Sequence, residues 1–187
     1  MQPVPKSPIR LLIVCLAACW AAACGVDRDR PAEIDLLARL TTAERRAGGN
    51  IDEAVRLDVV GIRGDARTAL VMRAPARVTW PVKLPLHARF LSALALVPAA
   101  QGLPRGVTVR VGLSDGRTYR EIGKAEATGT WVPVTLDLRE YSEWKFSVFY
   151  QPLRKTWQLV LNADATPGGP GGPGGKVAWD LPRLTRS

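Results

Sequence analysis

The sequence predicts a mainly β fold of the sandwich or jelly-roll type, preceded by one short α-helix. Three observations predict it: apolar and polar residues alternate in many short segments beyond residue 55, turn residues separate these segments, and helical spacing is confined to one stretch before them. The chain has 187 residues, a length that fits one domain with an appendage. Hydrophobic residues make up 47% and charged residues 23%, which is typical of a chain that buries a core.

The N-terminal segment has the order of residues found in a secretory signal. Two basic residues precede an apolar run from Leu11 to Cys24, which is shorter than the roughly 20 residues that a membrane-spanning helix needs. Small residues stand directly before Cys19 and before Cys24, and this resembles the lipobox of bacterial lipoproteins. The resemblance implies a signal peptide over residues 1–24, cleaved before one of the two cysteines, which then carries acyl chains such as palmitate. An ordinary secretory signal with incidental cysteines is the alternative.

A polar tether and a short helix are expected over residues 25–50. Pro31 suits the first turn of a helix, because its missing N–H would be unpaired there. Apolar residues at helical spacing follow it, namely Ile34, Leu37 and Leu40. The sandwich domain is then expected over residues 51–187.

Beyond residue 55 the apolar period changes from 3.6 to 2, which predicts strands. The alternating segment 107–113 is followed by Ser114-Asp115-Gly116 and a second segment at 118–122, which predicts a hairpin because glycine accepts positive φ. Segment 89–97 is apolar on both faces, as in a central strand covered on both sides. Further strands are expected near residues 57–62, 68–72, 78–84, 132–138, 146–150, 157–161 and 177–181, and the Gly/Pro-rich run 167–175 is expected to be a flexible loop.

The composition argues against catalysis. His87 is the single histidine and all three cysteines precede residue 25, so the body of the chain holds no Cys/His zinc motif. The sequence contains no calcium-binding DxDxDG loop, no phosphate-binding glycine loop and no sulfatase nucleophile motif. Five carboxylates could supply a structural calcium or a glycosidase pair but are expected at the surface: Asp137, Glu140, Glu143, Asp164 and Asp180. The sequence therefore predicts no enzyme, no cofactor and no metal site.

The chain is basic, with 26 Lys and Arg against 17 Asp and Glu, a formal charge of +9. Twenty of the basic residues are arginines, and they are scattered without a dense block. Long-range attraction to polyanions is screened by salt and says nothing about fold. No nucleic-acid partner is predicted.

Aromatic residues indicate where a sugar would bind, because a pyranose face stacks on an aromatic ring. Three tryptophans lie in strand patterns and are expected in the core: Trp80, Trp131 and Trp179. Other aromatic and basic residues lie in turns and are the candidate ligand-binding residues: Tyr141, Trp144, Arg154, Lys155 and Trp157. Packing of these aromatic rings under a long loop is the alternative.

Four segments have an order of elements that resembles the galactose-binding-like jelly roll. They are residues 90–96, 106–111, 131–138 and 176–184. Such modules occur as accessory regions of secreted bacterial proteins, including ahead of sulfatase-like domains. The resemblance covers roughly residues 50 to 184 and departs from the family pattern in two places, the longer segment 142–162 and the inserted Gly/Pro run.

These observations together predict a membrane-anchored, non-catalytic binding module of the bacterial cell envelope. The expected ligand is carbohydrate or another envelope component, and the expected location is the cell membrane or the outer membrane, with the domain outside the cytoplasm. The alternative is a structural or assembly module that binds a protein partner, such as a separately encoded hydrolase.

Overall fold

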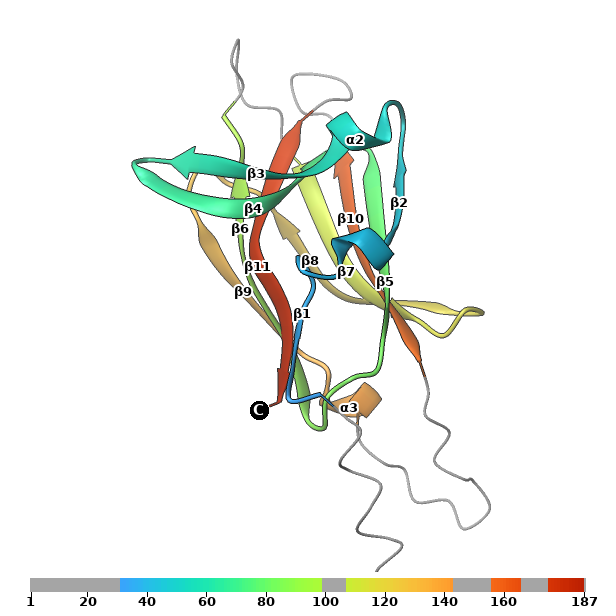
Figure 1. Ribbon diagram of the computed structural model, residues 1–187. Coiled ribbons are helices and arrows are strands. Elements are labelled where there is room, and N and C mark those ends of the chain that lie inside the picture. The colour runs from blue at the N-terminus through green and yellow to red at the C-terminus, as the bar shows by residue number, and fades with distance from the viewer. Residues whose placement is uncertain (1–30, 99–106, 143–155, 166–174, 187) are drawn as a thin grey trace, which may run out of the picture. The chain divides into compact units, whose positions relative to one another are not determined.

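Figure 1 shows the computed structural model, which describes residues 31–98, 107–142, 156–165 and 175–186. These residues form an antiparallel β-sandwich, so the predicted fold class is confirmed. The strands are β1 (Glu33–Asp35), β2 (Glu44–Ala47), β3 (Val55–Ile62), β4 (Asp65–Arg73), β5 (Ala76–Val82), β6 (Ala88–Leu96), β7 (Val107–Ser114), β8 (Tyr119–Glu126), β9 (Val132–Asp137), β10 (Trp157–Ala165) and β11 (Lys176–Arg186). The helical segments are η1 (Leu40–Thr42), α2 (Ile51–Ala54) and α3 (Arg139–Ser142).

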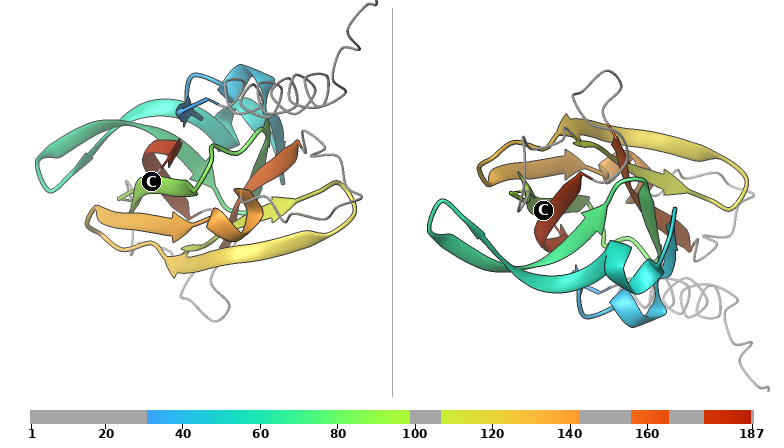
Figure 2. Two further views of the ribbon diagram at one scale, coloured as in Figure 1. Left: turned by 90° about the horizontal axis from the view of Figure 1, so that it is seen from below. Right: turned by 90° about the horizontal axis from the view of Figure 1, so that it is seen from above.

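The strands form two sheets. Sheet A has the order β3-β4-β11-β6-β9, and β1 also pairs with β11. Sheet B has the order β2-β5-β10-β7-β8. From β5 onward the chain crosses repeatedly between the sheets, and Figure 2 shows the two layers side by side when the molecule is viewed along them. Strands distant in sequence are therefore neighbours in space.

The main core fills the space between the two sheets. Inward-facing residues alternate along each strand, as Val109, Val111 and Leu113 do along β7. Trp80 of sheet B and Trp179 of sheet A are fully buried here, as predicted from their strand patterns. The ring of Trp179 meets that of Phe90 edge-on, with ring centroids 6.0 Å apart.

A second, smaller apolar cluster lies on the outer face of sheet A. Its buried members are Val60, Ile62, Ala69, Val71, Ala95 and Ala178. The twisted β3–β4 hairpin runs across the outer side of β11 and β6, and its apolar residues in this cluster pack with Ala178 of β11 and Ala95 of β6 (Figures 1 and 2). Strand β6 lies between β11 and β9 and carries Leu94 in the main core and Ala95 in this cluster, so its predicted burial on both faces is confirmed.

Trp131 does not lie in the main core, so this prediction from the strand pattern is wrong. Its ring is partly exposed and packs against the second cluster. The physical reason is its position directly before β9, an edge strand of sheet A, where the tip of the β3–β4 hairpin comes to lie beside it.

The helix predicted to begin at Pro31, within residues 25–50, is also wrong in its position. A short helix, α2, does precede the first long strand, but the segment before it forms β1, η1 and β2. Ile34 and Leu36 are both buried and alternate at period 2, and β1 pairs with β11. Strand β2 pairs with β5. Because pairing with distant strands overrides local helical spacing, the sandwich begins before residue 51.

The β7–β8 hairpin forms where the Asp-Gly sequence predicts it. Gly116 has a φ of 88°, and Asp115 Oδ1 accepts hydrogen bonds from the N–H groups of Arg117 and Thr118. The strand expected at 146–150 and the loop at 167–175 lie outside the described residues. Among the helices that the structure describes, none has the length and apolar character to cross a membrane.

Removal of β1 and β2 is expected to destabilise the sandwich. A fragment that starts at residue 50 lacks the buried side chains of Ile34 and Leu36, each of which contributes about 1.5–3 kcal/mol by burial. We expect the free energy of unfolding to fall by about 3–6 kcal/mol, a large share of the roughly 5–15 kcal/mol of a typical domain. Urea denaturation of this fragment, compared with a fragment that starts at residue 32, measures the difference. Equal stability of the two fragments would show that β1 and β2 are dispensable.

Candidate functional site

Two of the five candidate binding residues from the sequence lie together. The rings of Tyr141 and Trp157 meet edge-to-face, with centroids 5.6 Å apart and an interplanar angle of 86°. Both side chains are partly buried and pack against the main core. Trp144, Arg154 and Lys155 lie outside the described residues, as do Cys19 and Cys24, so a combined aromatic and cationic surface stays a prediction.

The carboxylates singled out in the sequence are placed mainly against arginines. Asp137 accepts hydrogen bonds from the side chain and backbone N–H of Arg139, which lower its pKa to about 2. Asp180 lies beside Arg67, and Asp164 lies 3.8 Å from Arg110 Nε. Glu140 is exposed, and Glu143 lies outside the described residues. Among the residues that the structure describes, no three His, Cys, Asp or Glu side chains converge to hold a metal ion.

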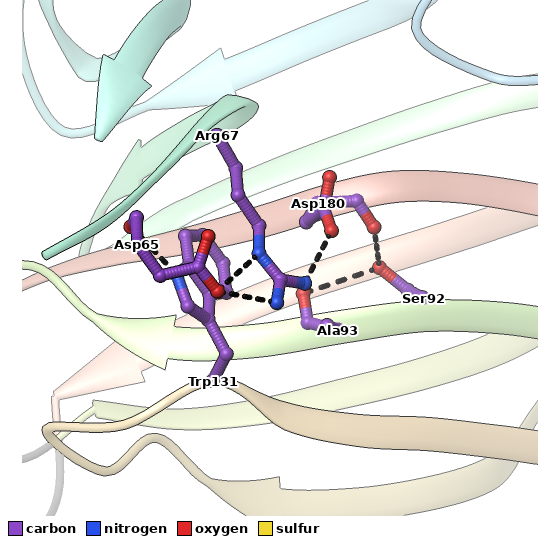
Figure 3. Close-up of polar contacts among 6 residues, drawn as sticks. All are labelled: Asp65, Arg67, Ser92, Ala93, Trp131 and Asp180. Carbon is purple, nitrogen blue, oxygen red and sulfur yellow. Dashed lines mark hydrogen bonds and ion pairs between the residues drawn. The ribbon is translucent and has the colours of Figure 1, made fainter. Parts of the chain in front are cut away.

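A polar cluster pins the β3–β4 hairpin to the outer face of sheet A (Figure 3). Arg67 of β4 donates from Nη2 to Asp65 Oδ2 at 2.6 Å and from Nη1 to Asp180 Oδ2 at 2.8 Å. Its Cζ lies 5.0 Å from the ring centroid of Trp131, and Trp131 Nε1 donates to the Asp65 carbonyl at 3.3 Å. Ser92 Oγ donates to the Asp180 carbonyl at 2.8 Å.

This cluster has the character of a structural clamp. The hydrogen bonds that Arg67 donates to Asp65 and then to Asp180 raise the pKa of Arg67, and the bond to Asp65 lowers the pKa of that carboxyl. The guanidinium is thus engaged on two sides by carboxylates, while the Trp131 ring lies between Arg67 and the second apolar cluster. These contacts join β4 to β11 and to the residue before β9, so the cluster holds the hairpin in place.

The outer face of sheet B, which we call the sheet B face, is different. Because Val109, Val111 and Leu113 point into the core, the alternating residues Arg110 and Gly112 point outward. The register then places further outward residues beside them: Asn162 of β10 lies between Arg110 of β7 and Arg77 of β5, and Val160 lies beside Gly112.

An exposed tyrosine lies across this face. A Cβ atom added to Gly112 would collide with the Tyr119 ring and come within 2.6 Å of the Arg120 carbonyl oxygen, so the ring of Tyr119 rests directly on the glycine. Tyr119 remains 39% exposed. Its hydroxyl lies 3.4 Å from Asn162 Nδ2, which donates to it, and the Arg77 guanidinium lies 5.9 Å from the ring centroid.

Charged groups of both signs surround this ring. Arg110 Nε lies 3.7 Å from Glu121 and 3.8 Å from Asp164, so one guanidinium is shared by two carboxylates. Burial raises the pKa of the Tyr119 phenol, and the charge of Glu121 adds to the shift, which keeps the hydroxyl protonated at neutral pH. An aromatic surface with amide, guanidinium and carboxylate groups at its rim suits a ligand that has an apolar face and polar edges.

The sequence does not predict a ligand site on the sheet B face. Tyr119 lies within the predicted strand 118–122, and the predicted aromatic candidates lie in turns. The signal that marks the site is Gly112 inside an alternating strand, because an interior glycine indicates close approach of another group. The β7–β8 register pairs Gly112 with Glu121 and Ser114 with Tyr119, so Tyr119 lies diagonally across from the glycine, and its ring is the group that approaches.

The two-sheet antiparallel sandwich is similar in fold to solved structures of carbohydrate-binding modules. One similar structure is TmCBM61 in complex with β-1,4-galactotriose, with a TM-score of 0.52 and 14% identity over 79% of this chain and 90% of that chain. Another contains the CBM51-2 and INT domains of Clostridium perfringens ZmpB, with a TM-score of 0.50 and 11% identity over 76% of this chain and 29% of that chain. At these identities the likeness concerns the fold.

Comparison of the amino-acid sequence with known proteins identifies no family for this chain. No protein-family model matches the chain, and no curated protein matches it.

Proposed function

We propose that this protein is a non-catalytic carbohydrate-binding module whose ligand lies on the sheet B face. The observation that carries the proposal is the ring of Tyr119 resting on Gly112, partly exposed and rimmed by Asn162 and Arg77. A pyranose presents axial C–H groups on one face and hydroxyls around its edge, so it matches a flat aromatic ring with polar neighbours. The similarity of the fold to TmCBM61, a protein named for its complex with a galactotriose, supports the ligand class.

The polar groups at the rim have separate roles in this proposal. The amide of Asn162 offers both a donor and an acceptor to sugar hydroxyls, and the guanidinium of Arg77 offers donors alone. Glu121 and Asp164 hold Arg110 in place from two sides and can also accept hydrogen bonds from hydroxyls. Because all of these groups come from strands paired in one sheet, the surface is rigid before the ligand arrives, which lowers the entropic cost of binding.

The carboxylates of the sheet B face, Glu121 and Asp164, are not arranged as a catalytic pair. A retaining or inverting glycosidase needs two carboxyl groups that face the scissile bond from opposite sides. On the sheet B face, Glu121 and Asp164 instead share the guanidinium of Arg110, which lies between them. Binding without turnover is therefore the function proposed for this surface.

Membrane attachment is the second part of the proposal. It rests on the apolar N-terminal run and on the small residues before Cys19 and Cys24. Acyl chains on one of these cysteines would hold the module at the cell membrane or the outer membrane, outside the cytoplasm, since two or three chains anchor far more firmly than one. In that setting the ligand would be a glycan of the cell envelope or one captured at the cell surface. An association with sulfatase-like domains stays a prediction from the sequence resemblance.

Replacement of the cysteines tests the anchor. We expect the variant with both Cys19→Ser and Cys24→Ser to lose labelling by a fatty-acid probe and to leave the membrane fraction, because the thiol is the acylated group. The two single variants identify the acylated cysteine, since labelling is lost in one of them and kept in the other. Persistent labelling of the double variant would contradict a lipid anchor on either residue.

Replacement of Tyr119 tests the binding face. We expect Tyr119→Ala to weaken glycan binding by roughly tenfold or more, because it removes the central aromatic contact. Isothermal titration calorimetry with β-1,4-galactotriose, and affinity electrophoresis against a panel of soluble polysaccharides, measure the change.

Two matched variants accompany this experiment. Tyr119→Phe keeps the ring and removes the hydroxyl beside Asn162, so its affinity should stay within about threefold of the natural protein. Tyr141→Ala, with folding checked by circular dichroism, tests the aromatic pair predicted from the sequence. Binding that is lost in the Tyr141 variant and kept in Tyr119→Ala would place the ligand at that pair and contradict the sheet B face as the site.

A further inference from the structure

Apart from the three-residue β1, four strands form the edges of the two sheets in the described part of the chain, and three of them are protected against pairing with another strand. Strand β9 carries Pro133, which cannot donate a backbone hydrogen bond. Strand β2 is four residues long, with three charged residues in the sequence ERRA. Strand β8 is charged and contains a register shift opposite Val111 and Gly112. Prolines, charges, bulges and short length are the usual means of blocking edge-to-edge association.

The fourth edge, β3, is open. It has eight residues and no proline, and it pairs with β4 without interruption from Val55 to Ile62. Two of its apolar side chains are exposed, Leu57 by 46% and Val59 by 68%. In Figure 1, β3 forms the margin of its hairpin, and its other side is unpaired in the sheet order of the described residues.

Two hydrogen bonds to side chains show which backbone groups of β3 point away from β4. The N–H of Val59 donates to Asp58 Oδ1 at 2.9 Å, and the carbonyl of Val55 accepts from Arg45 Nη1 at 3.4 Å. The N–H and C=O groups of Leu57 and Val59 therefore face away from β4, because outward groups alternate along an antiparallel strand. Val55 has the same orientation but is fully buried, and its N–H donates to the Ile51 carbonyl, so the edge is open only beyond Val55. The bond from Val59 to Asp58 involves an exposed carboxylate, so an incoming strand can replace it.

We infer that β3 pairs antiparallel with β3 of a second copy of this chain, around a two-fold axis at Leu57. In this register Leu57 faces its own counterpart, and the outward N–H and C=O groups of the two Leu57 residues bond to each other. Arg56 then faces Asp58 of the second copy, and Asp58 faces Arg56, which gives two cross-strand ion pairs on one face. Within one chain Arg56 Nη2 lies 2.8 Å from Asp58 Oδ2, so the two side chains already share that face.

The charges select this register over its neighbours. An axis moved by one residue toward the N-terminus places Arg56 opposite Arg56, and an axis moved by one residue toward the C-terminus places Asp58 opposite Asp58. Like charges directly opposite each other destabilise a strand pair. The axis at Leu57 also buries the Leu57 side chain, which the monomer exposes.

Pairing of this kind joins the two copies of sheet A into one continuous sheet and leaves both sheet B faces uncovered. The dimer would then present two ligand surfaces. Two weak sites on one particle bind a repetitive polymer more tightly than either site alone, because the second contact is intramolecular. The dimer itself does not depend on what the sheet B face binds.

Charge reversal tests the dimer on the full chain. Sedimentation-velocity ultracentrifugation in one non-ionic detergent, over a concentration series to about 100 μM, gives the dimer dissociation constant. We expect Arg56→Asp and Asp58→Arg each to weaken dimerisation by about tenfold or more, because each places like charges opposite one another at two positions. The double variant should dimerise like the natural protein. An equimolar mixture of the two single variants should form a heterodimer, because their charges are complementary.

A control and three contrary outcomes complete the test. Val132→Lys adds a charge at an exposed apolar residue on the proline-protected β9 edge and should leave the dissociation constant unchanged. A natural protein that stays monomeric throughout the series would overturn the inference. So would a dimer that is indifferent to both charge reversals, or one that Val132→Lys disrupts equally.

Discussion

The apolar layer between the two sheets is the interaction on which the rest of the molecule depends. Strand β11 shows why: it pairs with β4, β6 and β1, and it carries Trp179 into the middle of the layer. Strand β10 has the matching place in sheet B, between β5 and β7. No disulfide can assist, since all three cysteines precede residue 25. Stability therefore comes from burial of apolar side chains, and strict alternation of inward and outward residues is the condition for it.

The same alternation fixes the outward residues. Once Val109, Val111 and Leu113 face the core, Arg110 and Gly112 must face out, and a shift by one residue would bury a charge. The two outer faces are used differently. On sheet A the β3–β4 hairpin folds over small side chains and is held by Arg67, so much of that face is closed. On sheet B a glycine lets one aromatic ring approach the strand closely and stay partly exposed, with polar groups around it.

Much of the fold could be predicted from the sequence because its signals are local. Alternation at 107–113 and the Asp-Gly turn after it identify a hairpin without knowledge of any distant residue. The burial of Trp80 and Trp179 follows from the same pattern. The segment around Ile34 could not be predicted, because its apolar spacing fits a helix as well as a strand. Its pairing with Leu184, 150 residues away along the chain, decides between them.

The candidate site was harder to predict for a related reason. The ring of Tyr119 can rest on β7 only because Gly112 has no side chain, and the hairpin register brings the two residues together. Asn162 and Arg77 join them through strand pairings of sheet B that no local pattern encodes. Trp131 illustrates the reverse case, in which a strand pattern predicts burial in the core but an edge position places the ring under a hairpin.

The most direct test of the sheet B face is an NMR titration of the ¹⁵N-labelled protein with a soluble glycan that binds it, starting with β-1,4-galactotriose. The account predicts that the largest amide shift changes occur on β7, β8 and β10, at Gly112, Tyr119 and Asn162, with little change along β3, β4 and β11. Shift changes that gather around Tyr141 and Trp157, with the amides of the sheet B face unmoved, would contradict it.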